Sequence, residues 1–410
     1  MALVLVQSYN KEELFIIQDE EIAMSGSFGV TPQMFGAKGD GKSNDTKAIQ
    51  AAIDFASKNG GNLVTIPEGI YSVRNLKLKE NVTLMGEGER SILKADPSCK
   101  TWDGILYCEK LNSAEIKNLT FDGNKPIVPG DTQKGTVNIW VNYSKNVQIN
   151  DCTFQNNNYL GICIKSSDTV NIYNNKFLNL DCGVITTSYP SSNLTISNNY
   201  FDGAEFSEPI SIFGLKEGYH ENITITSNII KNHTKGSGIL VRAAKTVLIS
   251  DNAIDNCCTG IFLSTSEYKG TKYGVFDAIV ENNTITNSIC EGILIEGLNN
   301  SKVLNNKIEN AGSFGILTKN ADSSTISKNV LTNMDISSLT YDGFAMTLSG
   351  LTFSNVNNNT IVVINDKQID KNRKPITISA NSLNNTFSGN DVSLSFDDLY
   401  RKVSKINTFE

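Results

Sequence analysis

Two carboxylates and one cation stand at comparable places in a sequence unit that recurs along this chain of 410 residues. Asp181 lies two residues before the second apolar segment of its unit, Glu208 lies one residue before that of the next unit, and Arg242 ends that of the unit after. If the units stack as coils, the two carboxyl groups lie roughly 5 Å apart, the spacing of neighbouring strands. Repulsion at that range raises one pKa and prepares a general acid. The three residues are candidate catalytic groups for cleaving a glycosidic bond, although the carboxylates equally fit solvated turns.

Further polar and aromatic residues can bind a sugar polymer beside them. The segment 264–278 concentrates aromatic rings, which stack on the faces of sugar rings, and acids, which accept hydrogen bonds from hydroxyls. The same residues fit ordinary loop packing, and Glu296 also fits an ion pair with Lys319 one unit later. Trp140 is a weaker candidate of the same kind. The predicted substrate-binding residues are Lys165, Glu267, Tyr268, Tyr273, Asp277 and Glu296.

The unit that must position these residues recurs eleven times between residues 115 and 393. Each copy has an alternating apolar run, a short turn usually led by Asn, one further apolar residue and a second short run often opened by Gly-Ile. The turn residue is Cys at 152 and Asn at 175, 199, 228, 252, 283, 306, 329, 359 and 390. Steps of this kind, 23 to 31 residues long, are typical of a solenoid whose loops vary in length.

The pattern inside each unit predicts strands. Apolar residues alternate with polar ones, as at Val170 and Ile172, and neither a helical period nor a leucine-rich pattern accompanies them. Asn tolerates left-handed backbone angles and its amide can bond to the Asn of the next coil, although Asn can also simply mark turns. We therefore predict an all-β fold: a single-stranded right-handed parallel β-helix of about eleven coils with an N-terminal capping α-helix.

Three segments divide the chain. Residues 1–28 lack the unit and are interpreted as an N-terminal attachment segment, 29–395 as the parallel β-helix domain, and 396–410 as a C-terminal capping segment with the pattern of a short amphipathic helix. A helical cap is expected at 44–59, with its N-cap at 44 or 45. It closes the apolar end of the first coil and covers the unpaired strand edge. Its inward face consists of Ile49, Ala52, Ile53 and Ala56.

A row of mostly apolar residues is expected on the outward side of the second run of each unit. Alternation turns the second and fourth positions of this run into the coil and the third position outward. Such a stripe is larger than a soluble monomer leaves in water, so it predicts either a homotrimer or an insertion, such as 333–345 or 364–375, folded over the sheet. The row consists of Cys163, Ile185, Ser211, Leu240, Phe262, Leu294 and Leu317.

Composition argues against several classes of protein. The net charge of −7 leaves no basic footprint for nucleic acid, and no apolar stretch approaches the length of a membrane span. The eight cysteines include no Cys-x-x-Cys pair and are expected to be reduced thiols. Two histidines are too few for a zinc site, so no metal and no cofactor are predicted. The start MALVLV lacks the basic leader of a signal peptide, which predicts synthesis in a host cytoplasm without export.

The segment VTPQMFGAKGDG (30–41) resembles the pectate-lyase-like superfamily of polysaccharide-active β-helices and, within it, bacteriophage tail spikes and appendages. This resemblance implies a virion protein of the phage tail that binds a host-surface polysaccharide or cell-wall glycan and, as an open alternative, depolymerises it. It also implies a homotrimer attached to other tail proteins through residues 1–28. The alternatives are a bacterial, secreted polysaccharide hydrolase or lyase of the pectinase kind, and a structural or adsorption β-helix without catalysis.

The motifs of known glycan-cleaving enzymes are largely missing from the chain. LDCGV (180–184) is similar to part of the Asp-Asp-Cys segment of polygalacturonases, but the Asn-Thr-Asp, Gly-His-Gly and Arg-Ile-Lys motifs of that family are not present. The Asp-Pro-His signature of alginate epimerases is not present either. If the chain is an enzyme, a glycoside hydrolase or polysaccharide lyase is expected, and the sequence leaves that question open.

Overall fold

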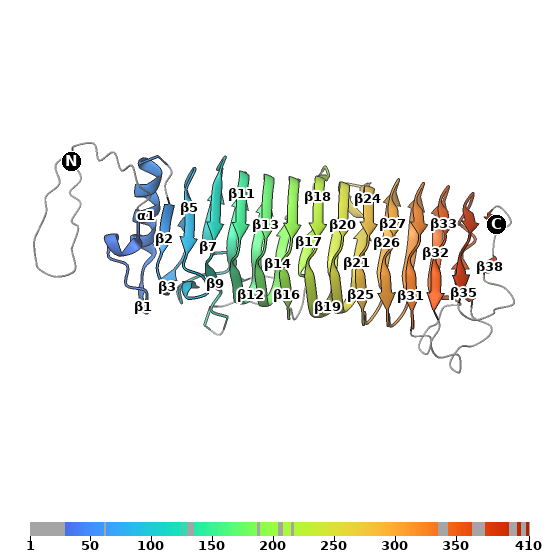
Figure 1. Cartoon of the computed structure of the whole chain (residues 1–410). Helices are drawn as coiled ribbons and strands as arrows, with labels where there is room; N and C mark the ends of the chain where they lie inside the picture. Colours follow the sequence, from blue (N-terminus) through green and yellow to red (C-terminus); the bar gives the residue numbers. More distant parts are fainter. Residues whose placement is uncertain are drawn as a thin grey trace, which may run out of the picture.

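The computed structural model describes the chain from residue 29 onward, and Figure 1 shows one elongated stack of strands with a helix at its N-terminal end. The described residues are 29–60, 63–125, 127–128, 135–186, 189–203, 208–214, 217–334, 343–362, 374–392, 400–402 and 407–409. The predicted attachment segment at 1–28 lies outside them.

Successive coils contribute strands to three parallel ladders that run along the stack. The first ladder consists of β2 (Leu63–Ile66), β5 (Thr83–Gly86), β8 (Ala114–Lys117), β11 (Lys145–Asn150), β13 (Asp168–Tyr173), β15 (Ser192–Ser197), β18 (His220–Thr226), β20 (Ala244–Ser250), β24 (Val275–Glu281), β27 (Lys302–Leu304), β30 (Thr325–Ser327), β33 (Asn355–Asn357), β36 (Thr386–Ser388) and β39 (Thr408–Phe409).

The second and third ladders follow the Asn turn, and four long strands bend from one into the other. These four are β12 (Thr153–Lys165), β14 (Lys176–Thr186), β19 (Ile229–Arg242) and β21 (Ala253–Ser264). The second ladder also contains β3 (Gly69–Val73), β6 (Ser91–Ala95), β9 (Thr120–Asp122), β16 (Tyr200–Asp202), β25 (Thr284–Thr286), β28 (Lys307–Glu309), β31 (Val330–Thr332), β34 (Thr360–Val362) and β37 (Asp391–Val392). The third also contains β4 (Leu76–Lys77), β7 (Gly104–Glu109), β10 (Val137–Asn142), β17 (Ile210–Ile212), β26 (Ile293–Asn299), β29 (Ile316–Asp322), β32 (Gly343–Thr352), β35 (Lys374–Ile378) and β38 (Tyr400–Lys402). The predicted parallel β-helix is confirmed.

The N-terminal cap matches its prediction. The helix α1 (Thr46–Lys58) lies at the end of the stack, after the 3-10 turn η1 (Pro32–Phe35) and β1 (Asp40–Asn44). Asn44 Oδ1 accepts the Thr46 N–H at the helix start, while the Asp45 carboxylate accepts the N–H groups of Lys38 and Gly39 in the preceding loop. The residues expected to face the coil are all fully buried: Ile49, Ala52, Ile53 and Ala56.

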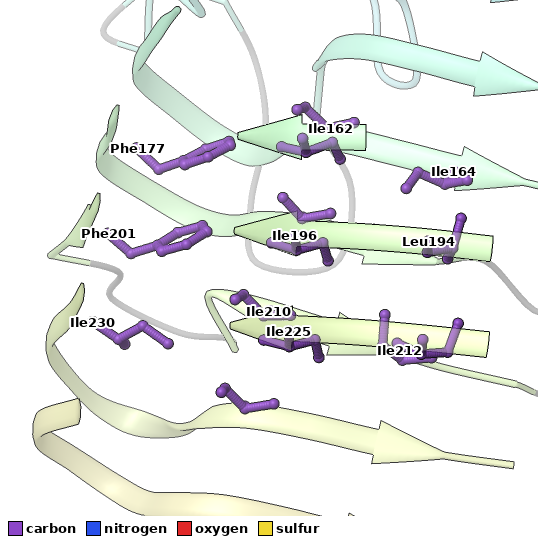
Figure 2. Packing of buried hydrophobic residues seen from close by; sticks show 14 of the residues in the cluster. Ile162, Ile164, Phe177, Leu194, Ile196, Phe201, Ile210, Ile212, Ile225 and Ile230 are labelled. Carbon is purple, nitrogen blue, oxygen red and sulfur yellow. The ribbon is translucent and has the colours of Figure 1, made fainter. Parts of the chain in front are cut away.

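The interior of the stack is filled by columns of matching apolar side chains. Phe121, Phe154, Phe177 and Phe201 stack with ring centroids 5.2, 4.7 and 4.5 Å apart and nearly parallel planes. Figure 2 shows Phe177 next to Phe201, with Ile230 continuing the column. Because each coil repeats the register of its neighbour, one apolar position per coil builds a continuous, close-packed core.

A column of buried Asn side chains follows the turns between the first and second ladders. Asn252 Oδ1 accepts both the backbone N–H and the side-chain N–H of Asn228, each at 3.0 Å. Its own Nδ2 donates to Asn283 Oδ1 and to the Ile225 carbonyl oxygen. The left-handed backbone angle belongs to the residue before, here Asp251 with φ of 58°. The predicted Asn ladder is thus confirmed. The ladder Asn makes the hydrogen bonds, and the residue before it adopts the left-handed conformation. The ladder comprises Asn175, Asn199, Asn228, Asn252, Asn283, Asn306, Asn329, Asn359 and Asn390, with Cys152 at its head.

The repeat extends beyond the eleven copies that the sequence pattern predicts. Coils precede residue 114, where strand register places Glu87 and Leu119 at the position that Asn takes later. At the other end, β38 and β39 pair with β35 and β36. The described parts of 396–410 are therefore strands, and the predicted amphipathic helix is wrong there. Pairing with the previous coil bonds the backbone groups, and this tertiary contact outweighs a weak helical pattern.

Most described members of the outward row of the third ladder are buried within a single chain, and Phe262 is half-buried. Cys163 is 2% exposed and packs with Leu160 and Cys182, while Leu294 and Leu317 are each 8% exposed and pack around the Phe314 ring. The expectation of an exposed apolar stripe is therefore wrong, because neighbouring side chains of the same chain cover it. An exposed apolar stripe therefore no longer supports the homotrimer, which stays a prediction. Most of the two insertions expected to cover the row lies outside the described residues, as does the Ile185 side chain.

Burial holds several ionisable side chains neutral. All eight cysteines are free thiols, and burial raises the pKa of Cys108 and Cys152 to about 12. Burial likewise lowers the pKa of His220 and His233 to about 4. His220 Nδ1 accepts the Ser191 N–H at 3.1 Å, whereas neither ring nitrogen of the buried His233 has a hydrogen-bond partner in the described part of the chain.

Replacing Asn252 with Leu should lower the free energy of unfolding by about 1–3 kcal/mol, because the Asn228 donors then lose their acceptor in the interior. Denaturant unfolding measures the loss. The matched control is Asn355→Leu on β33, where the side chain is exposed; it should change stability by less than about 0.5 kcal/mol. An Asn252→Leu variant as stable as the unmodified chain would mean that solvent satisfies these turns.

Acidification should destabilise the fold as the pH falls from about 6.5 to about 4. In this window the unfolded chain binds more protons than the folded chain, because the folded pKa of each His lies below its ordinary value of 6.5. Each His contributes up to about 3 kcal/mol. Unfolding curves of His233→Leu across the window should show a weaker pH dependence, and an unchanged dependence would contradict this assignment.

Candidate functional site

The outward face of the third ladder has two edges that differ in chemistry. Strand register aligns the last outward residue of each strand into one row, which we call the cation row. Its described members from β10 to β29 are Asn142, Lys165, Phe213, Arg242, Ser264, Glu296 and Lys319. The row contains three of the predicted site residues, and members on neighbouring coils lie about 4.8 Å apart in the backbone.

Lys165 lies between two partly exposed tyrosine rings. Its ammonium nitrogen is 5.2 Å from the Tyr143 ring centroid and 4.6 Å from that of Tyr189, and the two rings are 46% and 39% exposed. A hydrogen bond with the Tyr143 phenol raises the pKa of Lys165 above its usual value. The side chain therefore stays cationic and is held in place by the faces of the two rings.

Arg242 is held in the same way three coils further along. Its guanidinium carbon lies 5.2 Å from the Phe213 ring centroid and 5.9 Å from that of Phe262. The buried Nε has no hydrogen-bond partner within the described residues. Two aromatic rings thus flank the guanidinium, which is preorganised to bind a carboxylate.

The opposite edge of the face carries carboxylates and hydroxyls. Strand register places Cys182, Glu208, Ser237, Thr259 and Glu291 on successive coils along this edge, which we call the acidic edge. The Cys182 thiol donates to the Glu208 carbonyl oxygen at 2.7 Å, and Thr259 Oγ1 donates to Glu291 Oε2 at 3.0 Å. Cys182, Ser237 and Thr259 are buried, so the half-buried Glu208 and Glu291 are the residues of the acidic edge that can accept hydrogen bonds from sugar hydroxyls.

The structure separates two of the three predicted catalytic residues, Glu208 and Arg242. Glu208 aligns with Cys182 rather than with Asp181, whose side chain lies outside the described part. The register partner of Glu208 on the next coil is Ser237, and Arg242 follows five residues later, roughly 16 Å along the strand. Arg242 and Glu208 thus lie at opposite edges of the face, and the pairing of Asp181 with Glu208 stays a prediction.

Glu296 forms the ion pair that its position predicts. Lys319 Nζ lies 2.8 Å from Glu296 Oε1, and both side chains are partly exposed. An exposed ion pair of this kind contributes little stability. The pair with Lys319 accounts for the position of Glu296 without a role in sugar binding. The cation row therefore presents its unpaired positive charge at Lys165 and Arg242, among its described members.

The segment 264–278 forms an antiparallel hairpin of β22 (Ser266–Tyr268) and β23 (Thr271–Tyr273), with Glu267 exposed. The rings of Tyr273 and Phe276 pack edge-on against Tyr219 at 5.2 and 5.6 Å. The Lys245 ammonium lies 4.1 Å from the Tyr219 ring centroid. Two of the aromatic residues in this segment thus take part in packing.

The remaining predicted binding residues have local partners as well. Lys269 Nζ lies 5.3 Å from the Tyr268 ring centroid, and Asn300 Nδ2 donates to Asp277 Oδ1 at 2.6 Å. Asp277 lies in β24 (Val275–Glu281), with a left-handed φ of 51°. Glu267 and Tyr268 lie on the hairpin that follows Ser264 of the cation row, and the Ser266 hydroxyl donates to the carbonyl oxygen of Gly214, next to Phe213 in that row.

Sequence reasoning missed the aromatic residues that precede strands. Tyr219, Tyr143 and Tyr189 stand in turns, outside the repeated run on which the sequence comparison depends. Trp102 also stands in a turn and was missed for the same reason. The rarity of tryptophan, with only two in the chain, could have drawn attention to it. Coil register, rather than local sequence, brings Tyr143 and Tyr189 to Lys165 and Trp102 to Tyr159.

The described residues contain no group of three or more His, Cys, Asp or Glu side chains that could hold a metal ion. Among the same residues, no helix is long and apolar enough to cross a membrane.

Comparison with known families agrees with this architecture. The family model described as rhamnogalacturonase A/epimerase, pectate lyase-like, matches residues 31–262, and a right-handed β-helix model matches 237–396. The chain belongs to the rhamnogalacturonase A/epimerase, pectate lyase-like family. The resemblance that the segment 30–41 carries is therefore confirmed at the level of the superfamily.

Individual relatives of this pectate lyase-like chain match short parts of larger proteins. A 110-residue stretch is 42% identical to alginate lyase 7 of Azotobacter vinelandii, covering 24% of this chain and 13% of the relative. A 103-residue stretch is 34% identical to the preneck appendage protein of Bacillus phage PZA, covering 24% and 12%. The exopolygalacturonase structure from Thermotoga maritima has a TM-score of 0.65 and 16% identity over 82% of this chain and 91% of its own, which shows a shared fold.

Proposed function

We propose that this chain binds an acidic polysaccharide along the outward face of the third ladder. The observation that carries the proposal is the pair of cations in one row, Lys165 and Arg242, each held against two aromatic rings. Three coil steps separate them, or about 14 Å. They can therefore contact carboxylates on different sugar units of one extended polymer, while the acidic edge accepts hydrogen bonds from hydroxyls.

The attraction is local rather than a property of the whole molecule. The net charge of −7 repels a polyanion at long range. At physiological salt the Debye length is about 8 Å, so exposed charges elsewhere are largely screened at the face. Cations that aromatic rings hold in place lose little side-chain freedom on binding, which favours recognition of a carboxylate.

The same proposal includes a place on a phage particle. The identity to a preneck appendage protein and the resemblance of residues 30–41 to tail appendages support it. In this role the β-helix contacts the host glycan and residues 1–28 attach to other tail proteins. A homotrimer, which the sequence predicts, remains part of this proposal without the support of an exposed stripe.

Substituting Lys165 or Arg242 should weaken the binding of an acidic glycan by about tenfold, the equivalent of about 1.4 kcal/mol. Calorimetric titration of Lys165→Gln and Arg242→Gln with polygalacturonate and alginate oligomers measures the effect. Lys302→Gln is the matched control, because Lys302 is exposed on β27 of the first ladder. Equal affinity in all three variants would place the glycan on another surface.

If the chain also cleaves its glycan, Glu208 and Asp181 are the acids we expect to act, with Arg242 holding a neighbouring acidic sugar. Glu208→Gln keeps the shape of the side chain and removes its ionisable group, so turnover should be lost while binding stays largely intact. Release of reducing ends, and ultraviolet absorbance of unsaturated products, distinguish hydrolase from lyase. Full activity of both Glu208→Gln and Asp181→Asn would move the acid role to Glu267, Asp277, Glu291 or Glu296.

A further inference from the structure

Trp102 combines a strained backbone with an exposed aromatic ring. It lies in the turn before β7, its φ is 70°, and its side chain is 48% exposed. A left-handed conformation is costly for a bulky residue, and among the described residues most of the non-glycine residues that adopt it are Asn. The backbone is nevertheless held, since the Trp102 N–H donates to the Gly135 carbonyl oxygen at 2.7 Å. Strain at a well-bonded position is a reason to look for a function.

Neighbouring coils hold the indole in place. The Tyr159 ring meets it edge-on, with centroids 5.0 Å apart and planes at 88°. Tyr159 comes from β12, two coils further along, and packs against the buried cluster around Leu160 and Cys163. The exposed ring of Trp102 is therefore supported by the core of the third ladder, so its orientation is fixed before any ligand arrives.

A second pair of aromatic rings continues this surface across the face. Tyr107 and Trp140 are register partners on β7 and β10, with centroids 6.5 Å apart and planes 12° from parallel. Gly104 makes room for them, because a Cβ there would lie 2.8 Å from both Trp140 Cδ1 and Tyr107 Cε2. The Tyr107 hydroxyl accepts the Gly104 N–H and lies 3.4 Å from the Trp102 carbonyl oxygen, which links the two pairs.

This aromatic group lies beside the proposed glycan site. Lys165 is on β12, two coils from the start of β7, or about 10 Å along the stack. Trp102 is on the side of the acidic edge, since it precedes Gly104 at the start of its strand. A polymer that runs from the cations toward the N-terminal end of the face and crosses to the acidic edge can therefore contact the aromatic rings.

We propose that Trp102 is a stacking platform for one sugar ring at the N-terminal end of the third-ladder face. This inference rests on the proposed glycan binding and adds a neutral contact to the charged ones. The apolar face of a pyranose ring covers the indole, which removes apolar surface from water, and the ring hydroxyls at its edge stay solvated. Stacking of this kind does not depend on the charge of the sugar, so the platform should act on any unit of the polymer.

The two tryptophans of the chain allow a direct test. In Trp140→Phe, Trp102 is the single source of indole fluorescence. Titration of this variant with polygalacturonate or alginate oligomers should change that fluorescence, with a midpoint equal to the dissociation constant from calorimetry. In the otherwise unmodified chain, Trp102→Ala should weaken binding about three- to tenfold, and Trp102→Phe should retain most of the affinity.

Phe353→Ala is the matched control, because Phe353 is also an aromatic residue in a left-handed turn, with φ of 47° and 66% exposure, at the other end of the stack. It should leave binding unchanged. If the unmodified chain binds the oligomers but fluorescence stays constant and Trp102→Ala binds equally well, the platform is wrong and the cation proposal stands. If the unmodified chain binds neither oligomer, both proposals fall. Melting of each variant by circular dichroism separates lost binding from lost folding.

Discussion

Buried amide groups at the turns take most of their hydrogen-bond partners from the neighbouring coils, and this constraint sets the register of the stack. Asn228, Asn252 and Asn283 each accept two hydrogen bonds from the coil on one side and donate to the coil on the other. A slip of one residue would leave an amide unsatisfied in the interior and would turn the apolar columns outward. The phenylalanine column and the three ladders therefore share a single alignment.

The functional surface follows from that alignment. Residues on different coils fall into one row because every coil starts its third-ladder strand at the same register. The cations at Lys165 and Arg242 share a row for this reason, although 76 residues of sequence separate them. The same alignment puts Glu208 on the opposite edge. Loops that vary in length between the strands do not disturb these rows, so a rigid scaffold can carry a variable binding face.

Much of the fold could be predicted because it depends on a period. The alternation of Val170 and Ile172, the recurrent Asn and the apolar face of the helix at 46–58 all report burial, which repeats in every coil. The surface was less predictable. The outward residues Cys163 and Leu294 are covered by side chains that sequence alignment alone does not place beside them. Trp102 and Tyr143 stand in turns, where no period applies, and the distance between Glu208 and Arg242 depends on their positions along a strand rather than on their coils.

A crystal structure of the chain with a bound polygalacturonate or alginate oligomer tests the central claim most directly. The account predicts that the sugar units lie along the outward face of the third ladder, with carboxylates at Lys165 and Arg242. An oligomer bound to the first or second ladder, or to the β22–β23 hairpin alone, would contradict it.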